Sequence, residues 1–168
     1  MSTTTTEQTT LRGLEARVLN EGYGHGAWHG PDLKAALADV TTDLAFWRPA
    51  NGRHNIAEIA LHHAFCARAV RGQLSGRPPE SFVLDGEDWF ALSDDSVLPW
   101  SKILAVVETE QQQLAAIVAD AGQREPPMQD AERFNLVLGI TCHAAYHAGQ
   151  VQLIKRLHAG SSRSGEAA

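Results

Sequence analysis

The sequence predicts an all-α protein, a four-helix bundle with one additional short helix at its N-terminus. Three observations predict this fold. The 168 residues suit one domain, apolar residues recur at helical spacing, and strand-type alternation of apolar and polar residues is nearly absent. We expect the domain at residues 11–160. The threonine-rich residues 1–10 and the small, polar residues 161–168 are expected to be disordered tails.

The first two helices are predicted from apolar spacing and from glycine and proline positions. Apolar residues at helical spacing begin at Leu11 and stop in the glycine-rich stretch 22–30, which gives the additional short helix. The first long helix begins at Gly30-Pro31, because proline is well tolerated at the first helical position, and it ends before Pro49.

The remaining three helices have clearer boundaries. One begins at Asn55, which forms a predicted capping box with Glu58, and it ends at Gly76. The last two cover about residues 100–121 and 131–158. The connection over residues 76–100 is long, and a connection of that length usually has a function or crosses over the bundle.

Composition excludes several classes of protein. The net charge of −6 disfavours binding to nucleic acid, because affinity for phosphate backbones depends on clustered lysine and arginine. Two cysteines, Cys66 and Cys142, exclude a disulfide framework and indicate a reducing compartment. The N-terminus does not resemble a signal peptide, and no apolar run reaches about 18 residues. We therefore expect a cytoplasmic protein that does not bind membranes.

The eight histidines are the unusual feature of the composition. His143 and His147 are four residues apart on the last predicted helix, so they lie on one face, one turn apart. Both share rows with apolar residues and face the interior, where a neutral imidazole needs a hydrogen bond or a metal. Two such imidazoles can bind one ion. The alternative is a pair of core histidines bonded to the backbone or to each other.

A facing helix should supply further ligands, and the predicted helix at 55–75 contains His62 and His63. Periodicity favours His63 by a small margin, because it lies at the centre of the apolar stripe and His62 lies about a quarter turn to one side. Cys66 follows His62 by four residues and shares its face.

Several motifs in this order and spacing resemble the DinB/YfiT-like superfamily of metal-dependent enzymes. The resemblance covers most of residues 11–158, and its motifs are Trp28–Pro31 (WHGP), His54–His62 (HNIAEIALH) with Gly76 ending that helix, Trp89, and Gly139–Gln150 (GITCHAAYHAGQ). In that family the metal histidine follows the small residue that starts the helix by seven positions. Asn55 takes that starting position here, so His62 is the match. The sequence departs from the family at His63, where an aliphatic residue is usual, and at Cys66, where an aromatic residue is more common.

The resemblance implies a three-histidine site for a divalent ion, nickel or zinc, held by His62, His143 and His147. His63 is then either a core histidine with one hydrogen bond or a partner or base beside the metal. Ligation by Cys66 would close the site and make it structural; a small buried hydrophobic residue is the alternative.

Other residues have two interpretations each. Glu58 is either a base near the metal or only part of the capping box. Trp28 and His29 either line the pocket mouth or belong to a docked loop. Tyr146 and Gln150 either bond substrate or pack on the helix surface. The motif HAAYH lacks the glutamate of the HExxH zinc proteases, which argues against that class.

Three functions are compatible with such a site. The first is a hydrolase-like enzyme acting on a small molecule through metal-activated water. The second, from the resemblance, is a transferase or isomerase that uses a low-molecular-weight thiol, for which Arg53 and Arg68 are the nearby basic residues. The third is a non-catalytic, metal-stabilised scaffold. The resemblance also implies a homodimer, with Trp89, Phe90 and Trp100 as candidate interface residues.

Overall fold

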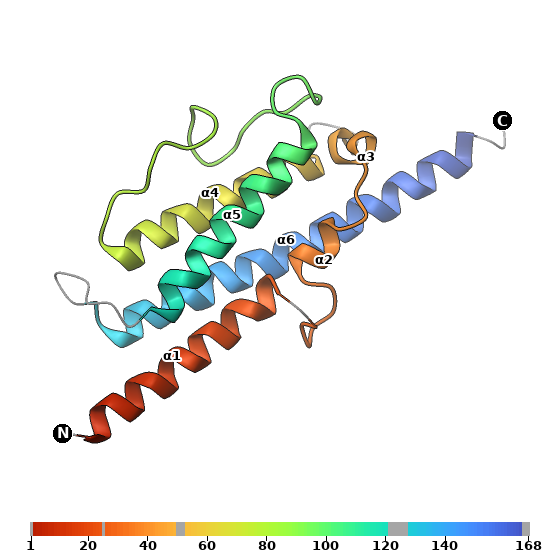
Figure 1. Ribbon diagram of the computed structural model, residues 1–168. Helices are drawn as coiled ribbons and strands as arrows, with labels where there is room; N and C mark the ends of the chain where they lie inside the picture. Colours follow the sequence, from red (N-terminus) through yellow and green to blue (C-terminus); the bar gives the residue numbers. More distant parts are fainter. Residues whose placement is uncertain (1, 25, 50–52, 121–127, 166–168) are drawn as a thin grey trace.

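The computed structural model describes residues 2–24, 26–49, 53–120 and 128–165, and these form six α-helices (Figure 1). The long ones are α1 (Ser2–Gly22), α4 (Ile56–Ser75), α5 (Trp100–Ala119) and α6 (Asp130–Gly165). Two short ones, α2 (Leu33–Leu37) and α3 (Thr42–Phe46), lie between α1 and α4. The prediction of an all-α four-helix bundle is confirmed. Within the described part of the chain, no helix has the length and hydropathy that a membrane span requires.

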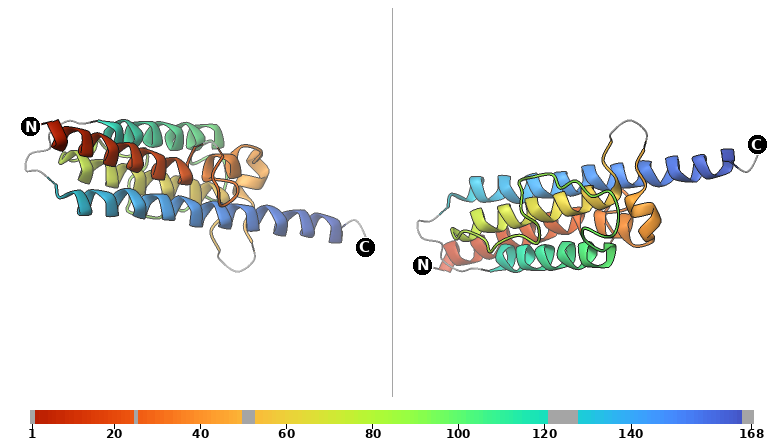
Figure 2. Two further views of the ribbon diagram at one scale, coloured as in Figure 1. Left: turned by 90° about the horizontal axis from the view of Figure 1, so that it is seen from below. Right: turned by 90° about the horizontal axis from the view of Figure 1, so that it is seen from above.

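The four long helices pack so that α1 and α4 each contact both α5 and α6. Helices α1 and α6 run in one direction and α4 and α5 in the other (Figures 1 and 2). Two consecutive parallel helices need a connection that returns along the bundle. Residues 76–99 make that crossover, as the sequence predicted, and they pass over one face of the bundle (Figure 2).

The N-terminal helix differs from the expectation in length and in role. It begins at Ser2 instead of Leu11, and it is one of the four bundle helices instead of an addition to them. At the other end α6 continues to Gly165, past the expected boundary at residue 160. Helix nucleation is costly but extension of a formed helix is not, so a packed helix can continue into a polar segment. Residues 1 and 166–168 of the expected tails lie outside the described residues.

The long helix expected over residues 30–48 is also corrected, because two short helices replace it. The Asp32 side chain accepts a hydrogen bond from the Ala35 N–H at 3.0 Å and caps α2. The Thr41 hydroxyl accepts one from the Leu44 N–H at 3.3 Å and caps α3. A side chain that caps a new helix start competes with a continuous helix, so the segment breaks between the two caps.

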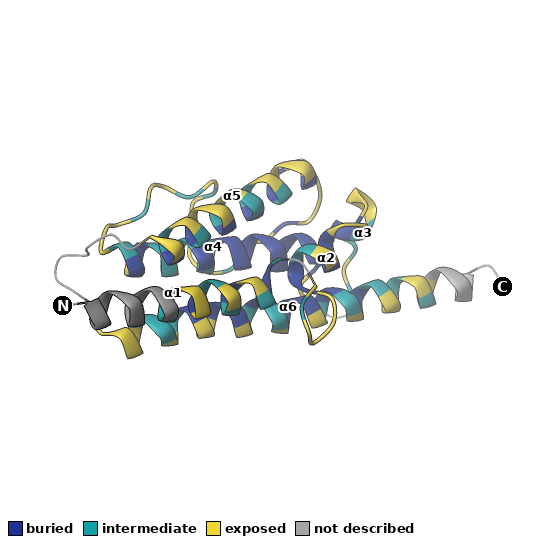
Figure 3. Ribbon diagram, turned by 60° about the horizontal axis from the view of Figure 1, so that its bottom comes forward, coloured by how far each residue is buried: buried dark blue, intermediate teal, exposed yellow. Residues whose placement is uncertain are grey.

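Helix α4 is the most deeply buried element of the bundle (Figure 3). Its predicted capping box is present: Asn55 Oδ1 accepts from the Glu58 N–H at 2.8 Å, and the Asn55 N–H is 3.4 Å from Glu58 Oε2. The helix ends as predicted at Gly76, whose φ of 69° a glycine adopts easily. Because α4 packs against both α5 and α6, its histidines lie inside the protein.

Candidate metal centre

Three imidazoles from two helices meet between α4 and α6. The Nε2 atom of His143 lies 3.0 Å from Nε2 of His62 and 3.1 Å from Nε2 of His147. His62 and His147 are buried, and His143 is half-buried. Two nitrogens bound to one ion at about 2.0–2.1 Å lie roughly 2.9–3.4 Å apart at ligand angles of about 90–110°. The three Nε2 atoms therefore have a spacing that suits one divalent ion.

The other ring nitrogen of each histidine has its own partner. His62 Nδ1 is 2.8 Å from the Asp88 carbonyl oxygen, and His147 Nδ1 is 2.6 Å from Gln150 Oε1. Carbonyl oxygens only accept, so both Nδ1 atoms must donate, and both Nε2 atoms of the neutral rings then carry lone pairs. If His143 carries its hydrogen on Nε2, it can donate to the Nε2 lone pair of His62 or to that of His147, but not to both. The donor set therefore matches a cation better than a network of hydrogen bonds.

Burial also keeps two of these rings ready to bind metal. Burial, together with the positive charges that protonated His147 and His62 would carry, lowers the pKa of His143 to about 4. Burial likewise lowers the pKa of His147 to about 4. Both rings are therefore neutral near pH 7, the form in which imidazole binds metal.

His63 contacts the Nδ1 atom of His143, which is the ring nitrogen outside the cluster of three Nε2 atoms. Its Nδ1 atom is 3.3 Å from Nδ1 of His143, its ring stacks on Tyr23, and only 1 % of its surface is exposed. Burial lowers its pKa to about 3. Periodicity favoured His63 for the metal face, but in the structure it is His62 whose Nε2 joins the other two. His63 is placed to bond the outer nitrogen of His143.

Cys66 lies next to the three imidazoles. Its sulfur is 3.8 Å from Nε2 of His62, and ligand atoms of His62, Cys66 and His143 all lie within 4.8 Å of one another, so this group could also hold a metal. Burial, with a contribution from the negative charge of Asp88, raises the pKa of the thiol to about 11. Cys142 is exposed.

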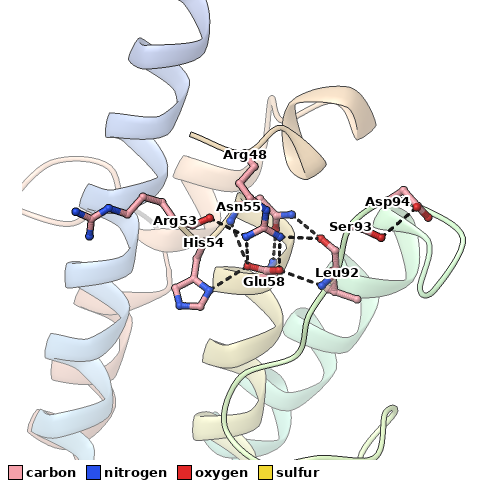
Figure 4. Close-up of polar contacts among 8 residues, drawn as sticks. All are labelled: Arg48, Arg53, His54, Asn55, Glu58, Leu92, Ser93 and Asp94. Carbon is pink, nitrogen blue, oxygen red and sulfur yellow. Dashed lines mark hydrogen bonds and ion pairs between the residues drawn. The ribbon is translucent and has the colours of Figure 1, made fainter. Parts of the chain in front are cut away.

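Glu58 is fully occupied by structural contacts (Figure 4). Its Oε1 atom accepts from Arg48 at 2.5 Å and from the Leu92 N–H at 3.0 Å, and its Oε2 atom from Arg48 and His54, both at 3.0 Å. These hydrogen bonds outweigh burial and hold the pKa of Glu58 below its usual value. The carboxylate is thus a weak base tied to the start of α4, which supports its capping role over a catalytic one.

The four residues predicted for the substrate pocket divide into two pairs. Trp28 is 93 % exposed, its backbone N–H donates to Glu21 Oε2, and His29 Nε2 is 2.7 Å from the Glu21 carbonyl oxygen. This pair is a loop docked on the end of α1, and its contacts are not with the imidazoles. Tyr146 and Gln150 do lie at the imidazoles: Gln150 Nε2 donates to the Tyr146 hydroxyl at 3.1 Å, which leaves Gln150 Oε1 for His147.

Of the two basic residues considered for a thiol substrate, Arg68 contacts an aromatic ring of the crossover. The guanidinium of Arg68 lies over the Phe82 ring, 5.6 Å from its centre. The Arg53 side chain extends away from Glu58 (Figure 4).

Two residues of the crossover contact His62, and the sequence assigned neither of them to the site, although Trp89 is one of the family motifs. Asp88 accepts from its ring, and the Trp89 indole stacks on it with 3.9 Å between ring centres. The sequence marked residues 76–100 only as a long connection, and no spacing rule tells which residue of a long crossover reaches a given helix.

Comparison with known protein families matches residues 26–151 to the family described as the DinB superfamily. The matched region contains His62, His143 and His147, and it leaves out α1. Searches of curated proteins and of solved structures gave no match.

Proposed function

This chain belongs to the DinB superfamily, and from that premise we propose that it is a metal-dependent enzyme that hydrolyses a small molecule. The proposed ligands are His62, His143 and His147, and the proposed ion is nickel or zinc, both of which imidazole suits. The convergence of the three Nε2 atoms, with separations of 3.0 and 3.1 Å, is the observation that supports this most strongly.

The protein's own residues would prepare the site before any ion arrives. Asp88 and Gln150 hold the outer nitrogens of His62 and His147, so both rings present lone pairs. A divalent ion held by three imidazoles supplies Lewis acidity and lowers the pKa of a bound water toward about 7. Tyr146, 64 % exposed, and His143, half-buried, put the site within reach of solvent.

The proposal is tested by metal analysis of the purified protein after loading with nickel or zinc. We expect one ion per chain in the wild type and a loss of bound ion in His62→Ala, His143→Ala and His147→Ala. His29→Ala is the matched control, because the contact described for the His29 ring is with the Glu21 carbonyl oxygen at the end of α1. Wild-type metal content in His147→Ala would sink the three-histidine site.

A closed, non-catalytic site is the second candidate, and the position of Cys66 favours it. Ligation by this sulfur together with the three imidazoles would leave a tetrahedral ion without an open position for water or substrate. The buried thiol, whose pKa is about 11, would then have to lose its proton on binding.

Proton release separates the two candidates. Calorimetry in buffers of different ionisation enthalpy counts the protons released when the ion binds. If Cys66 is not a ligand, wild type and Cys66→Ala should release the same number. If it is a ligand, wild type should release one more, and the cobalt form should show a sulfur-to-metal charge-transfer band that Cys66→Ala lacks.

Activity is tested with the loaded protein on small ester and amide substrates. A second set of reactions combines a low-molecular-weight thiol with an electrophile. Turnover of the first set that is lost in His143→Ala supports the hydrolase. Turnover of the second set alone would replace it with the thiol-dependent reaction.

A further inference from the structure

The crossover between α4 and α5 is strained at the point where it meets the imidazoles. Asp88 has φ of 65°, the one positive value for a non-glycine residue in the described part of the chain. The Trp89 N–H donates to the Glu87 carbonyl oxygen at 2.8 Å, which closes a three-residue turn around Asp88. A non-glycine residue adopts this conformation at a cost in free energy, and it persists only where the surroundings enforce it.

The strained turn brings two oxygen atoms of Asp88 to one nitrogen of His62. The carbonyl oxygen lies 2.8 Å and the carboxylate Oδ1 3.1 Å from His62 Nδ1. The Asp88 side chain is 61 % exposed, so burial of the carboxylate does not explain the contact. Two acceptors on one ring nitrogen require that nitrogen to carry the hydrogen.

The Trp89 indole stacks on the face of the His62 ring. The indole lies between His54 and His62, with ring centres 3.7 and 3.9 Å away and interplanar angles of 12° and 7°. His54 lies just before the N-cap of α4 and His62 lies within the helix, so the indole joins a residue outside α4 to one inside it. The stack opposes rotation of the His62 ring out of its plane.

We propose that Asp88 and Trp89 are positioning residues that clamp His62 as the Nδ1–H tautomer with its Nε2 atom directed at His143. This rests on the proposed metal site for its purpose, because the clamp is useful only if Nε2 binds an ion. The clamp itself is a property of the ion-free protein. It explains why the chain keeps a strained residue in an exposed loop: the turn is what carries both oxygens to the ring.

The direct test is the tautomer of His62 in the ion-free protein, read by long-range proton–nitrogen NMR. Wild type should show His62 as the Nδ1–H form. Asp88→Ala removes the carboxylate and disfavours the positive φ, so we expect a mixture of tautomers. Asp88→Gly keeps the turn and the carbonyl oxygen, so it should retain more of the Nδ1–H form. Glu87→Gln removes a charge from the neighbouring exposed position and should resemble wild type.

The second test is the affinity for Co²⁺ added alone. Substituting a group that orients a ligand typically weakens metal binding about 10–100-fold. We expect that loss in Asp88→Ala and Trp89→Ala, a smaller loss in Asp88→Gly and Trp89→Phe, and a change of less than about twofold in Glu87→Gln. Thermal unfolding of each variant checks that it is folded at the temperature used.

Two results would overturn the clamp. One is an Nδ1–H tautomer of His62 that persists in both Asp88→Ala and Trp89→Ala. The other is a Co²⁺ affinity in those variants equal to that of Glu87→Gln. If instead the wild type binds no Co²⁺, the proposed metal site fails, and the NMR result alone decides whether Asp88 and Trp89 set the His62 tautomer.

Discussion

The Nε2 atoms of His62 and His143 lie 3.0 Å apart, although 81 positions separate the two residues in the chain. The first ring is held by a carbonyl oxygen of the crossover and the second faces His63, so different elements orient the two imidazoles. The centre therefore depends on the packing of α4 against α6 and on the path of the crossover between α4 and α5.

Added nickel or zinc should stabilise the protein. A ligand that binds only the folded state at 100 times its dissociation constant adds about 2.7 kcal/mol. In a chain of this size that corresponds to a rise in Tm of roughly 5–10 °C. Differential scanning calorimetry with and without the ion measures it. The rise should disappear in His147→Ala and remain in His29→Ala; an equal rise in both variants would mean that the ion binds elsewhere.

Replacing His63 should weaken metal binding without destabilising the fold. His63→Leu removes the partner of His143 Nδ1, and loss of such a partner typically costs about 10–100-fold in metal affinity. The imidazole is buried and its pKa is about 3, so an apolar side chain of similar size is well tolerated there. Chelator competition measures the affinity, and urea unfolding the stability.

The matched control for His63→Leu is His29→Leu, at an exposed position. It should leave the affinity unchanged. Unchanged affinity in His63→Leu as well would show that His63 is only a core residue, the first of the two interpretations that the sequence allowed.

Glu58→Gln should lower stability in a pH-dependent way. The buried carboxylate bonds Arg48, His54 and the Leu92 N–H, so we expect a loss of about 2–3 kcal/mol at pH 7. The pKa of Glu58 lies below its ordinary value of 4.5 when the protein is folded. Its stabilising contribution is thus complete above about pH 4.5 and is lost as the pH falls through the lowered pKa.

Urea unfolding at pH 7 and pH 3.5 checks this prediction. The difference between wild type and Glu58→Gln should be smaller at the lower pH, and Glu87→Gln, at an exposed position, should differ little from wild type at either. Metal affinity of folded Glu58→Gln should match wild type. A stable variant that fails only in turnover would restore Glu58 as a catalytic base.

The buried ion pair between Glu15 and Arg133 should stabilise the packing of α1 in the bundle. Arg133 Nε donates to Glu15 Oε2 at 2.8 Å, and the Glu15 side chain has no exposed surface. Breaking such a pair costs about 3–5 kcal/mol, because the remaining charge stays buried without its partner. We expect about 3 kcal/mol for Glu15→Ala, since Arg133 also donates to the Val118 carbonyl oxygen.

Urea unfolding measures this loss, with the exposed Arg17→Ala as control, expected within about 0.5 kcal/mol of wild type. The double variant Glu15→Leu/Arg133→Met should recover much of the stability, because an apolar pair can replace a buried ion pair. If Glu15→Ala is as stable as the control, the ion pair contributes little to the packing of α1.

The sequence by itself determined the helical class, the two ends of α4 and the pairing of His143 with His147. These features are local: a capping box, a terminal glycine and an i, i+4 spacing depend on residues within a few positions of one another. Local rules failed at residues 30–48, where apolar spacing suggested one helix and the caps at Asp32 and Thr41 divide it. They also failed for α1, whose place in the bundle depends on α5 and α6.

Periodicity left open which histidine of α4 faces the other two, and the family resemblance implied His62. Only the tertiary structure brings its Nε2 atom beside that of His143 and shows what holds the ring there. Helices α5 and α6 both pack on α4, and both His62 and His63 are buried, so a 3.6-residue period cannot separate them. The approach of Asp88 and Trp89 to His62 depends on the path of a crossover with no repeating pattern. Periodicity reports the angle of a residue around its own helix, whereas the partner it meets is set by how the helices and the crossover pack.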